Sequence, residues 1–316
     1  MQHTDTPLAV AVDLGGTRFR VALVGRQGDL HTHDVYDTRP ASGPDAILAR
    51  IGEAIVRAAA AAPAGAGVVG VGIVAPGPVD PWRGVVYRAP NLPGWDNFPL
   101  ADRLAALCHL PVRAGNDANL AALGEHRFGA GRGVSHMIYL TVSTGVGGGI
   151  VVDDRLLLGA RGVAGEPGHM TIDLHGRRCN CGNYGCLETL ASGTAIAREA
   201  AAALAAGRPS ALGGSGGMPT AAAVDAAALA GDRLAIDLME AAARAMGVGV
   251  VNLLHLFDPR LVVIGGGVSR SGELWWRTLR AEVERRAMPI YLQGLQIVPA
   301  ALGDDAGLYG AAAMVL

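Results

Sequence analysis

The sequence contains no lysine: all 26 of its basic residues are arginine, in a chain of 316 residues. Walker-type phosphate loops, pyridoxal or Schiff-base enzymes and protein kinases each depend on a lysine amine. The sequence therefore excludes these three classes. Codon usage that favours arginine would produce the same composition, so the bias by itself indicates no function.

Other features are also missing. The formal net charge is −2 with basic and acidic residues interspersed, which excludes an electrostatic footprint for nucleic acid. The first residues lack a basic segment followed by an apolar one, and no apolar run reaches about 18 residues. We expect a soluble, cytoplasmic protein without a membrane partner. Its length suggests about two domains.

A pattern of strand, glycine turn and strand occurs twice. Apolar runs at 8–13 and 19–24 flank one glycine turn, and runs at 137–143 and 150–152 flank another. This repetition predicts a duplicated α/β unit, with two halves and a cleft between them.

The remaining pattern supports the same class. Apolar residues at helical or strand spacing predict further elements. The predicted helices cover 46–62, 118–128, 194–206, 220–230 and 235–256, and the predicted strands cover 67–75, 110–114 and 261–264. The Gly/Ser-rich segment 207–219 predicts a mobile loop.

Three glycine-rich segments follow strands: 13–17 (DLGGT), 143–149 (STGVGGG) and 265–267 (GGG). Glycine lets backbone N–H groups approach an anion closely, so these segments indicate a phosphate site. A plain hairpin turn is the alternative for each one taken alone. Asp13 is either a turn residue or a carboxylate that organises Mg²⁺ near phosphates.

The segment 115–119 (GNDAN) lies between a predicted strand and a predicted helix. Asn116 and Asp117 are suited to cap the helix, and their position by itself favours this interpretation. The alternative is a general base at the carboxyl edge of a sheet, where open α/β sheets bind ligands.

Four candidate metal ligands fall within 18 residues: His169, Cys179, Cys181 and Cys186. One imidazole and three thiolates match the ligands of tetrahedral zinc. With all four bound, the ion has no open coordination position, so the site would be structural. Free thiols or a disulfide are the alternatives, and a disulfide is unusual in a cytosolic chain. Cys108 lies outside the cluster and is expected to be a small buried hydrophobe.

Together, these segments resemble the ROK family of sugar kinases and sugar-responsive repressors, over essentially the whole chain. The resemblance is carried by 13–17, 115–119, 143–149, 165–169 (GEPGH), 179–188 (CNCGNYGCLE) and 258–259 (DP) followed by 265–267. The cysteine segment is the most specific. The resemblance implies the actin/hexokinase type of fold, a duplicated ribonuclease H-like architecture with an interdomain cleft.

The resemblance also implies the roles of individual residues. Asp117 would be the general base. The residues that would bind the sugar are Gly77, Asn91, Asn116, Asp117, Glu166, His169 and Glu188. The residues that would bind ATP and its Mg²⁺ are Asp13, Gly15, Gly16, Thr17, Arg18, Thr144, Gly145, Gly265, Gly266 and Gly267. Two positions depart from the family pattern, with Arg18 where relatives often have lysine and Pro167 where they often have isoleucine.

The resemblance predicts an ATP-dependent hexose kinase, specifically a glucokinase acting on the 6-hydroxyl. An N-acetylmannosamine kinase, an N-acetylglucosamine kinase, a fructokinase and a sugar-sensing regulator are the alternatives. We expect a small domain of residues 1–115 with the C-terminal helix 303–316, a large domain of 116–302 that carries the zinc segment, and a homodimer.

Overall fold

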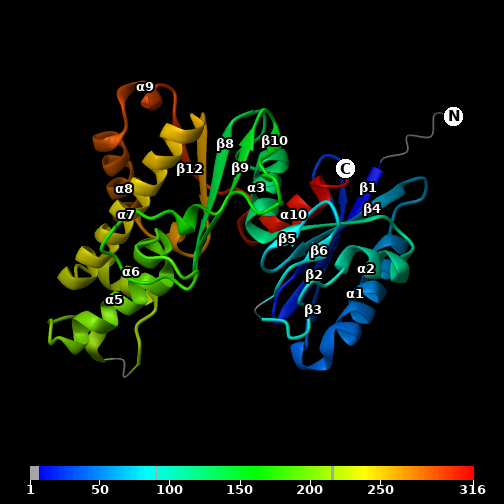
Figure 1. Cartoon of the computed structure of the whole chain (residues 1–316), viewed down its shortest axis with the longest axis horizontal. Helices are drawn as coiled ribbons and strands as arrows, with labels where there is room; N and C mark the ends of the chain where they lie inside the picture. Colours follow the sequence, from blue (N-terminus) through cyan, green and yellow to red (C-terminus); the bar gives the residue numbers. More distant parts are fainter. Residues whose placement is uncertain (1–6, 90, 215–216) are drawn as a thin grey trace. The chain divides into compact units, whose positions relative to one another are not determined.

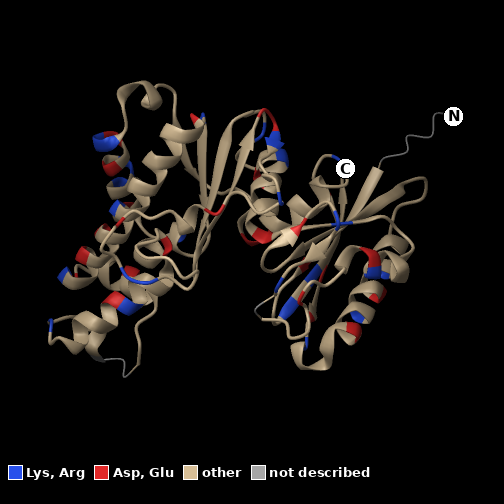
Figure 2. Ribbon diagram, in the orientation of Figure 1, with Lys and Arg blue, Asp and Glu red and all other residues tan. Residues whose placement is uncertain are grey.

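A computed structural model of the chain describes residues 7–89, 91–214 and 217–316. The chain forms two compact units (Figure 1). Of the described residues, unit 1 contains those up to 135 together with 149–165 and 301–316, and unit 2 contains those in 136–148 and 166–300. Part of the predicted loop 207–219 lies outside the described residues. Arginine and acidic residues are interspersed along the helices of both units (Figure 2).

Unit 1 is built on a five-stranded sheet of order β3-β2-β1-β4-β7. Its strands are β1 (Pro7–Leu14), β2 (Arg18–Gly25), β3 (Leu30–Asp37), β4 (Gly67–Ala75) and β7 (Val112–Asn116). The first three strands are antiparallel, whereas β4 and β7 run parallel to β1. The carboxyl ends of β1, β4 and β7 therefore lie at one edge of this sheet.

Helices cover both faces of the unit 1 sheet. They are α1 (Gly43–Ala60), α2 (Leu100–Cys108), α3 (Asp117–Phe128) and α10 (Ala306–Ala313), with short elements η1 (Pro40–Ser42), β5 (Val79–Asp80), β6 (Val85–Val86) and η5 (Gly303–Asp305). Side chains of β1 alternate between two cores, as a strand's period of two requires. Leu8 and Val10 join the core that includes α1, while Ala9 and Ala11 join the core that includes α10.

Small residues let α10 pack against backbone. A Cβ on Gly310 would lie 1.7 Å from the Leu120 carbonyl oxygen of α3, and one on Gly72 would lie 1.8 Å from the Ala311 carbonyl oxygen. This close packing places α3 in unit 1, whereas the predicted domain boundary at 115/116 assigns that helix to the other half.

The second sheet repeats the first in its strand order, β10-β9-β8-β11-β12. Its strands are β8 (Met137–Val142), β9 (Val146–Val152), β10 (Arg155–Leu156), β11 (Leu261–Gly265) and β12 (Gln296–Pro299). As in unit 1, the later strands are parallel: β11 pairs with β8 and with β12 in parallel. The predicted duplication is confirmed.

Helices of unit 2 include the long α7, which is buried along one face. The helical elements are η2 (Pro167–His169), α4 (Glu188–Ala191), α5 (Gly193–Ala205), η3 (Ala211–Gly214), α6 (Ala221–Leu229), α7 (Arg233–Phe257), η4 (Val268–Arg270), α8 (Glu273–Arg286) and α9 (Pro289–Leu292). Among the described residues, no helix combines the length and apolarity needed to cross a membrane.

One prediction about the second glycine segment is wrong. Gly147, Gly148 and Gly149 lie inside β9 rather than in a turn, and the turn is limited to Ser143–Gly145. Close packing explains these glycines: a Cβ on Gly148 would lie 2.5 Å from Pro167 Cγ and 2.8 Å from the Tyr139 carbonyl oxygen. These glycines therefore allow neighbouring residues to pack closely against β9.

Replacing Gly310 by alanine should destabilise unit 1, because the new methyl group meets the α3 backbone rather than a flexible side chain. We expect the free energy of unfolding to fall by about 3 kcal/mol, at the upper end of overpacking effects. Gly67→Ala is the control, since nothing lies within 4 Å of its Cβ position. Thermal denaturation of both variants measures the difference, and equal melting temperatures would contradict the packing described.

Candidate functional site

Asn116 caps α3 and joins it to a neighbouring turn. Its Oδ1 accepts hydrogen bonds from the backbone N–H groups of Ala118 (3.0 Å) and Asn119 (3.3 Å). Its Nδ2 donates to the carbonyl oxygen of Gly77 at 3.1 Å. Gly77 follows β4 with φ of 83°, a value that favours glycine. The cap predicted for this segment is confirmed, and Asn116 provides it.

Asp117 is thereby released from the capping role. Its Oδ1 accepts from the Ala118 N–H at 2.8 Å, and the side chain keeps contact with solvent. Surrounding protein raises the pKa of Asp117 above its usual value, and repulsion from Asp13 adds to this effect, whereas the Ala118 hydrogen bond opposes it. A carboxylate with a raised pKa at a sheet edge has the properties of a proton acceptor.

The first glycine turn connects β1 and β2. The Gly15 N–H donates to the Arg18 carbonyl oxygen at 3.0 Å, and Thr38 Oγ1 donates to the Gly15 carbonyl oxygen at 2.7 Å. Thr17 and Arg18 are exposed on this turn. Asn91 lies against Gly16, since a Cβ there would be 3.1 Å from the Asn91 Cβ. The structure therefore brings Asn91 together with this turn.

Asp13 is not a free carboxylate. It forms an ion pair with Arg20, its cross-strand partner on β2. Arg20 also donates to Asp305 Oδ1 at 2.6 Å and to the Asp304 carbonyl oxygen at 2.7 Å. Sequence reasoning missed Arg20, although its position opposite Asp13 in a hairpin was the available signal.

Unit 2 carries the other two glycine segments on neighbouring strands. Because Gly265 pairs with Thr141 in parallel, the turns that follow β11 and β8 emerge at the same edge of the sheet. Gly266 has φ of 88°, and a Cβ there would lie 2.5 Å from the Val142 carbonyl oxygen. The two turns can therefore approach each other only because this position is glycine.

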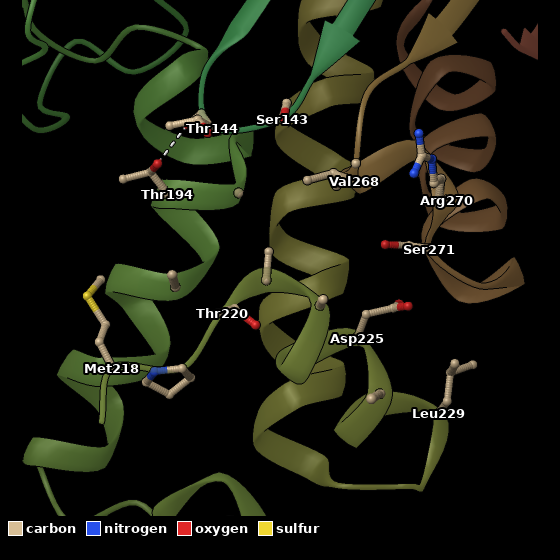
Figure 3. Close-up of a pocket in the computed structure, with 17 residues that line it drawn as sticks. Ser143, Thr144, Thr194, Met218, Thr220, Asp225, Leu229, Val268, Arg270 and Ser271 are labelled. Carbon is tan, nitrogen blue, oxygen red and sulfur yellow. Dashed lines mark hydrogen bonds between the residues drawn. The ribbon is translucent and has the colours of Figure 1, made fainter. Parts of the chain in front are cut away.

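A pocket of about 800 Å³ opens beside these turns (Figure 3). Ser143, Thr144 and Gly267 are among its lining residues, and Thr194 Oγ1 donates to the Thr144 carbonyl oxygen at 2.7 Å. Other lining residues belong to α5, α6 and η4 or lie next to them in the chain, and they were not predicted as site residues. They include Met218, Thr220, Asp225, Leu229, Arg270 and Ser271. No local motif marks them, because only the packing of α5, α6 and η4 brings them together.

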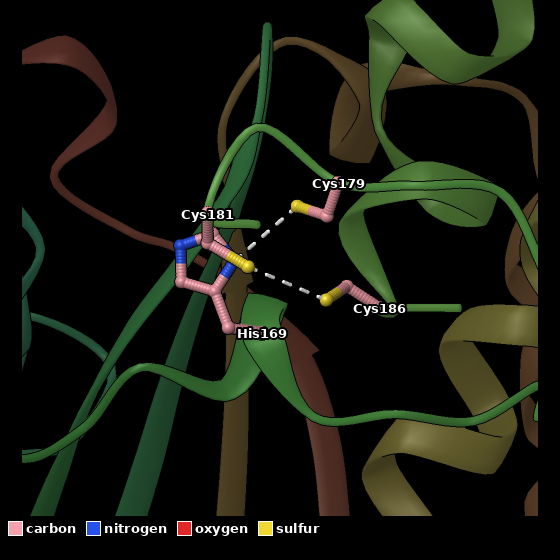
Figure 4. Close-up of side chains that lie close together, drawn as sticks. All are labelled: His169, Cys179, Cys181 and Cys186. Atoms are coloured by element: carbon pink, nitrogen blue, oxygen red, sulfur yellow. Dashed lines mark hydrogen bonds between the residues drawn. The ribbon is translucent and has the colours of Figure 1, made fainter. Parts of the chain in front are cut away.

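His169, Cys179, Cys181 and Cys186 form one cluster, as predicted (Figure 4). Their ligand atoms all lie within 4.8 Å of one another. The Cys181 and Cys186 sulfurs are 3.7 Å apart, and Cys179 Sγ lies 3.7 Å from His169 Nδ1. Four ligands at tetrahedral zinc distances would be separated by roughly 3.5–3.8 Å. The donor set and spacing therefore fit zinc, and all four cysteines of the chain are free of disulfides.

Glu188 connects this cluster to the Ser143–Gly145 turn. Its Oε2 accepts from the Val146 N–H at 3.0 Å, and its Oε1 lies 3.8 Å from Cys179 Sγ. A Cβ on Gly145 would lie 2.4 Å from Glu188 Oε2, so glycine is required there. Glu166 is exposed, and its carbonyl oxygen accepts from the His169 N–H at 3.1 Å.

The two sheets of matching strand order define the class of α/β proteins with the actin/hexokinase type of fold. The sequence matches the ROK family over residues 9–316. The chain therefore belongs to the ROK family.

Known members resemble it over nearly their full length. A glucokinase from Thermotoga maritima is 39% identical over 309 residues, which cover 97% of this chain and 96% of the relative. The solved ROK hexokinase from Thermus thermophilus has a TM-score of 0.84 at 38% identity, covering 98% and 97% of the two chains. A ROK glucokinase from Streptomyces griseus, solved with glucose and AMPPNP, has a TM-score of 0.77 at 38% identity, covering 98% and 99%.

We predict that the cluster binds zinc when the protein is purified without chelator, at about one ion per chain. Cys179→Ser should lower the zinc content and the melting temperature together, because metal binding and folding are coupled. Cys108→Ser is the control, since Cys108 lies outside the cluster. Elemental analysis and thermal denaturation test this, and a zinc-free wild-type protein would refute it.

Proposed function

We propose that this protein is an ATP-dependent hexose kinase, specifically a glucokinase that phosphorylates the 6-hydroxyl of its sugar. The observation that carries the proposal is Asp117, a carboxylate of raised pKa at the carboxyl edge of the unit 1 sheet. Membership of the ROK family and the pocket beside two strand-end turns support it.

Asp117 would accept the proton of the sugar hydroxyl as the γ-phosphoryl group passes to that oxygen. Its raised pKa makes its carboxylate a better proton acceptor than that of an ordinary aspartate. The Ala118 N–H holds one carboxylate oxygen, which orients the other toward a substrate hydroxyl. The protein needs no lysine for this step.

Binding of the nucleotide is assigned to backbone amides. In unit 2 the turns that contain Thr144, Gly145, Gly266 and Gly267 would hold its phosphates, and the adjoining pocket would receive its nucleoside. In unit 1 the segment 15–18 is a second phosphate turn. Magnesium would supply the remaining positive charge. Asp13 is the carboxylate proposed to face it, with Oδ2 engaged by Arg20.

Binding of the sugar is assigned to two groups of polar side chains. Gly77, Asn91 and Asn116 belong to unit 1. Glu166, His169 and Glu188 belong to unit 2. In the first group, the α3 cap connects Asn116 to Gly77, and Asn91 lies against Gly16. The second is attached to the metal cluster, which would restrict these side chains and so reduce the entropy lost on binding.

An ADP-release assay over glucose, fructose, mannose, N-acetylmannosamine and N-acetylglucosamine distinguishes the candidate activities. The proposal requires the highest kcat/KM with glucose. The homodimer and the cytoplasmic location stay predictions, which gel filtration with light scattering and cell fractionation can test.

Asp117→Asn should lower kcat by about 10²–10⁴, the usual contribution of a general base. In the wild type, kcat/KM should fall as pH decreases through the raised pKa of Asp117, beginning above the usual aspartate value of about 4. The variant should lose this acidic limb. Residual activity within tenfold of the wild type would show that Asp117 is not the base.

The same variant should keep its stability at pH 7. Because the pKa of Asp117 is higher in the folded chain than in the unfolded chain, stability falls as pH rises from the unfolded pKa through the folded pKa. The neutral amide removes this cost and still accepts from the Ala118 N–H. We expect the melting temperature to stay equal or to rise, which separates loss of activity from loss of fold.

Glu188 should affect both substrates, because it contacts the phosphate turn and the cluster. Glu188→Ala removes the acceptor of the Val146 N–H and should raise KM for ATP as well as for glucose, by about tenfold. Glu188→Gln keeps an acceptor oxygen and should restore KM for ATP more than KM for glucose. Steady-state kinetics with each substrate varied measures these effects. An unchanged KM for ATP in the alanine variant would show that Glu188 affects sugar binding alone.

A further inference from the structure

A second recess lies in unit 1 at the carboxyl end of α3, with a volume of about 570 Å³. Its polar lining includes Arg26, His126, Arg127, Arg132 and Asp154. Figure 2 shows basic positions at this end of α3. The proposed base is at the other end of the same helix, about 18 Å away for twelve residues at 1.5 Å each. The function proposed above does not use this recess.

Three arginines of the recess have no partner among the residues that the structure describes. Across residues 7–89, 91–214 and 217–316, no ion pair or hydrogen bond engages the guanidinium groups of Arg26, Arg127 and Arg132, and all three residues are exposed. Other arginines of the chain pair with a carboxylate or a carbonyl oxygen, for example Arg20, Arg50 and Arg208. These three therefore present free donors to the recess.

The acidic residue of the recess already has partners. Asp154 Oδ1 lies 3.3 Å from His126 Nε2, and its Oδ2 accepts from Ser135 Oγ at 2.9 Å. Asp154 has φ of 61° in the turn between β9 and β10, so the backbone fixes it in place. It offsets one of three positive charges. The carboxyl end of α3 adds only about half a negative charge, so the recess stays positive.

Backbone packing brings the arginines to the same place. Arg26 lies in the turn between β2 and β3, where the Gly28 N–H donates to the Gly25 carbonyl oxygen at 2.9 Å. Gly28 has φ of 86°, and a Cβ there would lie 2.9 Å from the ring of Phe128. This contact fixes the turn against the end of α3. Arg127 belongs to the last turn of α3, and Arg132 follows in the loop.

We propose that this recess binds a small molecule that carries a phosphate group, such as a sugar phosphate or a nucleotide. Guanidinium groups match phosphate oxygens with paired hydrogen bonds. The volume is within the range of small-molecule sites, and Leu123, Phe128 and Ala313 supply an apolar wall for the body of the ligand. Neutralising three like charges would stabilise the fold, so the ligand should act as a stabiliser.

A macromolecular polyanion is a different kind of partner. The recess has a limited volume, and the chain has a net charge of −2 with interspersed charges. Nucleic acid normally requires an extended basic surface. The observations therefore favour a small ligand.

The test measures binding of inorganic phosphate by calorimetry and by melting temperature, with chloride at equal ionic strength as the reference. The wild type should bind phosphate and melt at a higher temperature in its presence. The triple variant Arg26→Gln, Arg127→Gln, Arg132→Gln should weaken binding at least tenfold and lose most of the thermal shift. Basal phosphorylation should stay unchanged in this variant, which shows that it folds.

Arg277→Gln is the matched control for Arg132→Gln. Arg277 is exposed on α8, outside the recess, and has no partner among the described residues. Arg132→Gln should weaken phosphate binding about threefold or more, whereas Arg277→Gln should leave it unchanged. Equal binding by the wild type and the triple variant would overturn the proposal, and so would equal losses in the two single variants.

Further titrations identify the source of the phosphate group. Glucose 6-phosphate and ATP are compared with inorganic phosphate, each on the wild type and the triple variant. A loss of affinity in the variant for either organic ligand supports the proposal and identifies the class of ligand that the recess binds. A short single-stranded oligonucleotide that binds more tightly than all three, with the same arginine dependence, would refute a small-molecule site. Binding is measured without turnover, so these results do not depend on the proposed kinase activity.

Discussion

The side chain of Asn116 connects the end of β7, the Gly77 turn after β4 and the first turn of α3. Both ends of its amide are used, so neither can rotate without leaving a backbone group unpaired. This constraint sets the direction in which α3 leaves the sheet. It also leaves the adjacent Asp117 free of the capping role, with its carboxylate at the sheet edge. The proposed catalytic role of Asp117 therefore depends on the neutral side chain of Asn116, which caps α3 in its place.

Glu188 also connects separate segments, in this case within unit 2. Its carboxylate contacts the Ser143–Gly145 turn through the Val146 N–H and the His/Cys cluster through Cys179. A change at the cluster is therefore transmitted to the turn through a single side chain. Gly145 makes the contact possible, because any side chain there would occupy the space of the carboxylate. This arrangement connects the proposed metal site to the proposed phosphate turn.

Much of the fold was predictable because its signals are local. The apolar runs of β1 and β4, the helical spacing in α1 and α7, and the spacing of the four cluster ligands each depend on neighbours in sequence. The strand β3 was missed because most of its residues are exposed and polar, so it lacks the apolar pattern. The glycines of β9 were misassigned to a turn. Glycine occurs both in turns and where a strand packs closely against its neighbours, and the sequence does not distinguish these two cases.

The sequence alone determined the class of the protein, the duplicated sheet and the identity of the cluster, because each depends on residue types at short spacing. Only the tertiary structure decided which of Asn116 and Asp117 caps α3, that Asp13 is paired with Arg20, and which helices line the unit 2 pocket. It also brought Arg26, Arg127 and Arg132 to one recess. These outcomes depend on contacts between residues far apart in the chain, and their energies are set by burial and charge that no short segment contains.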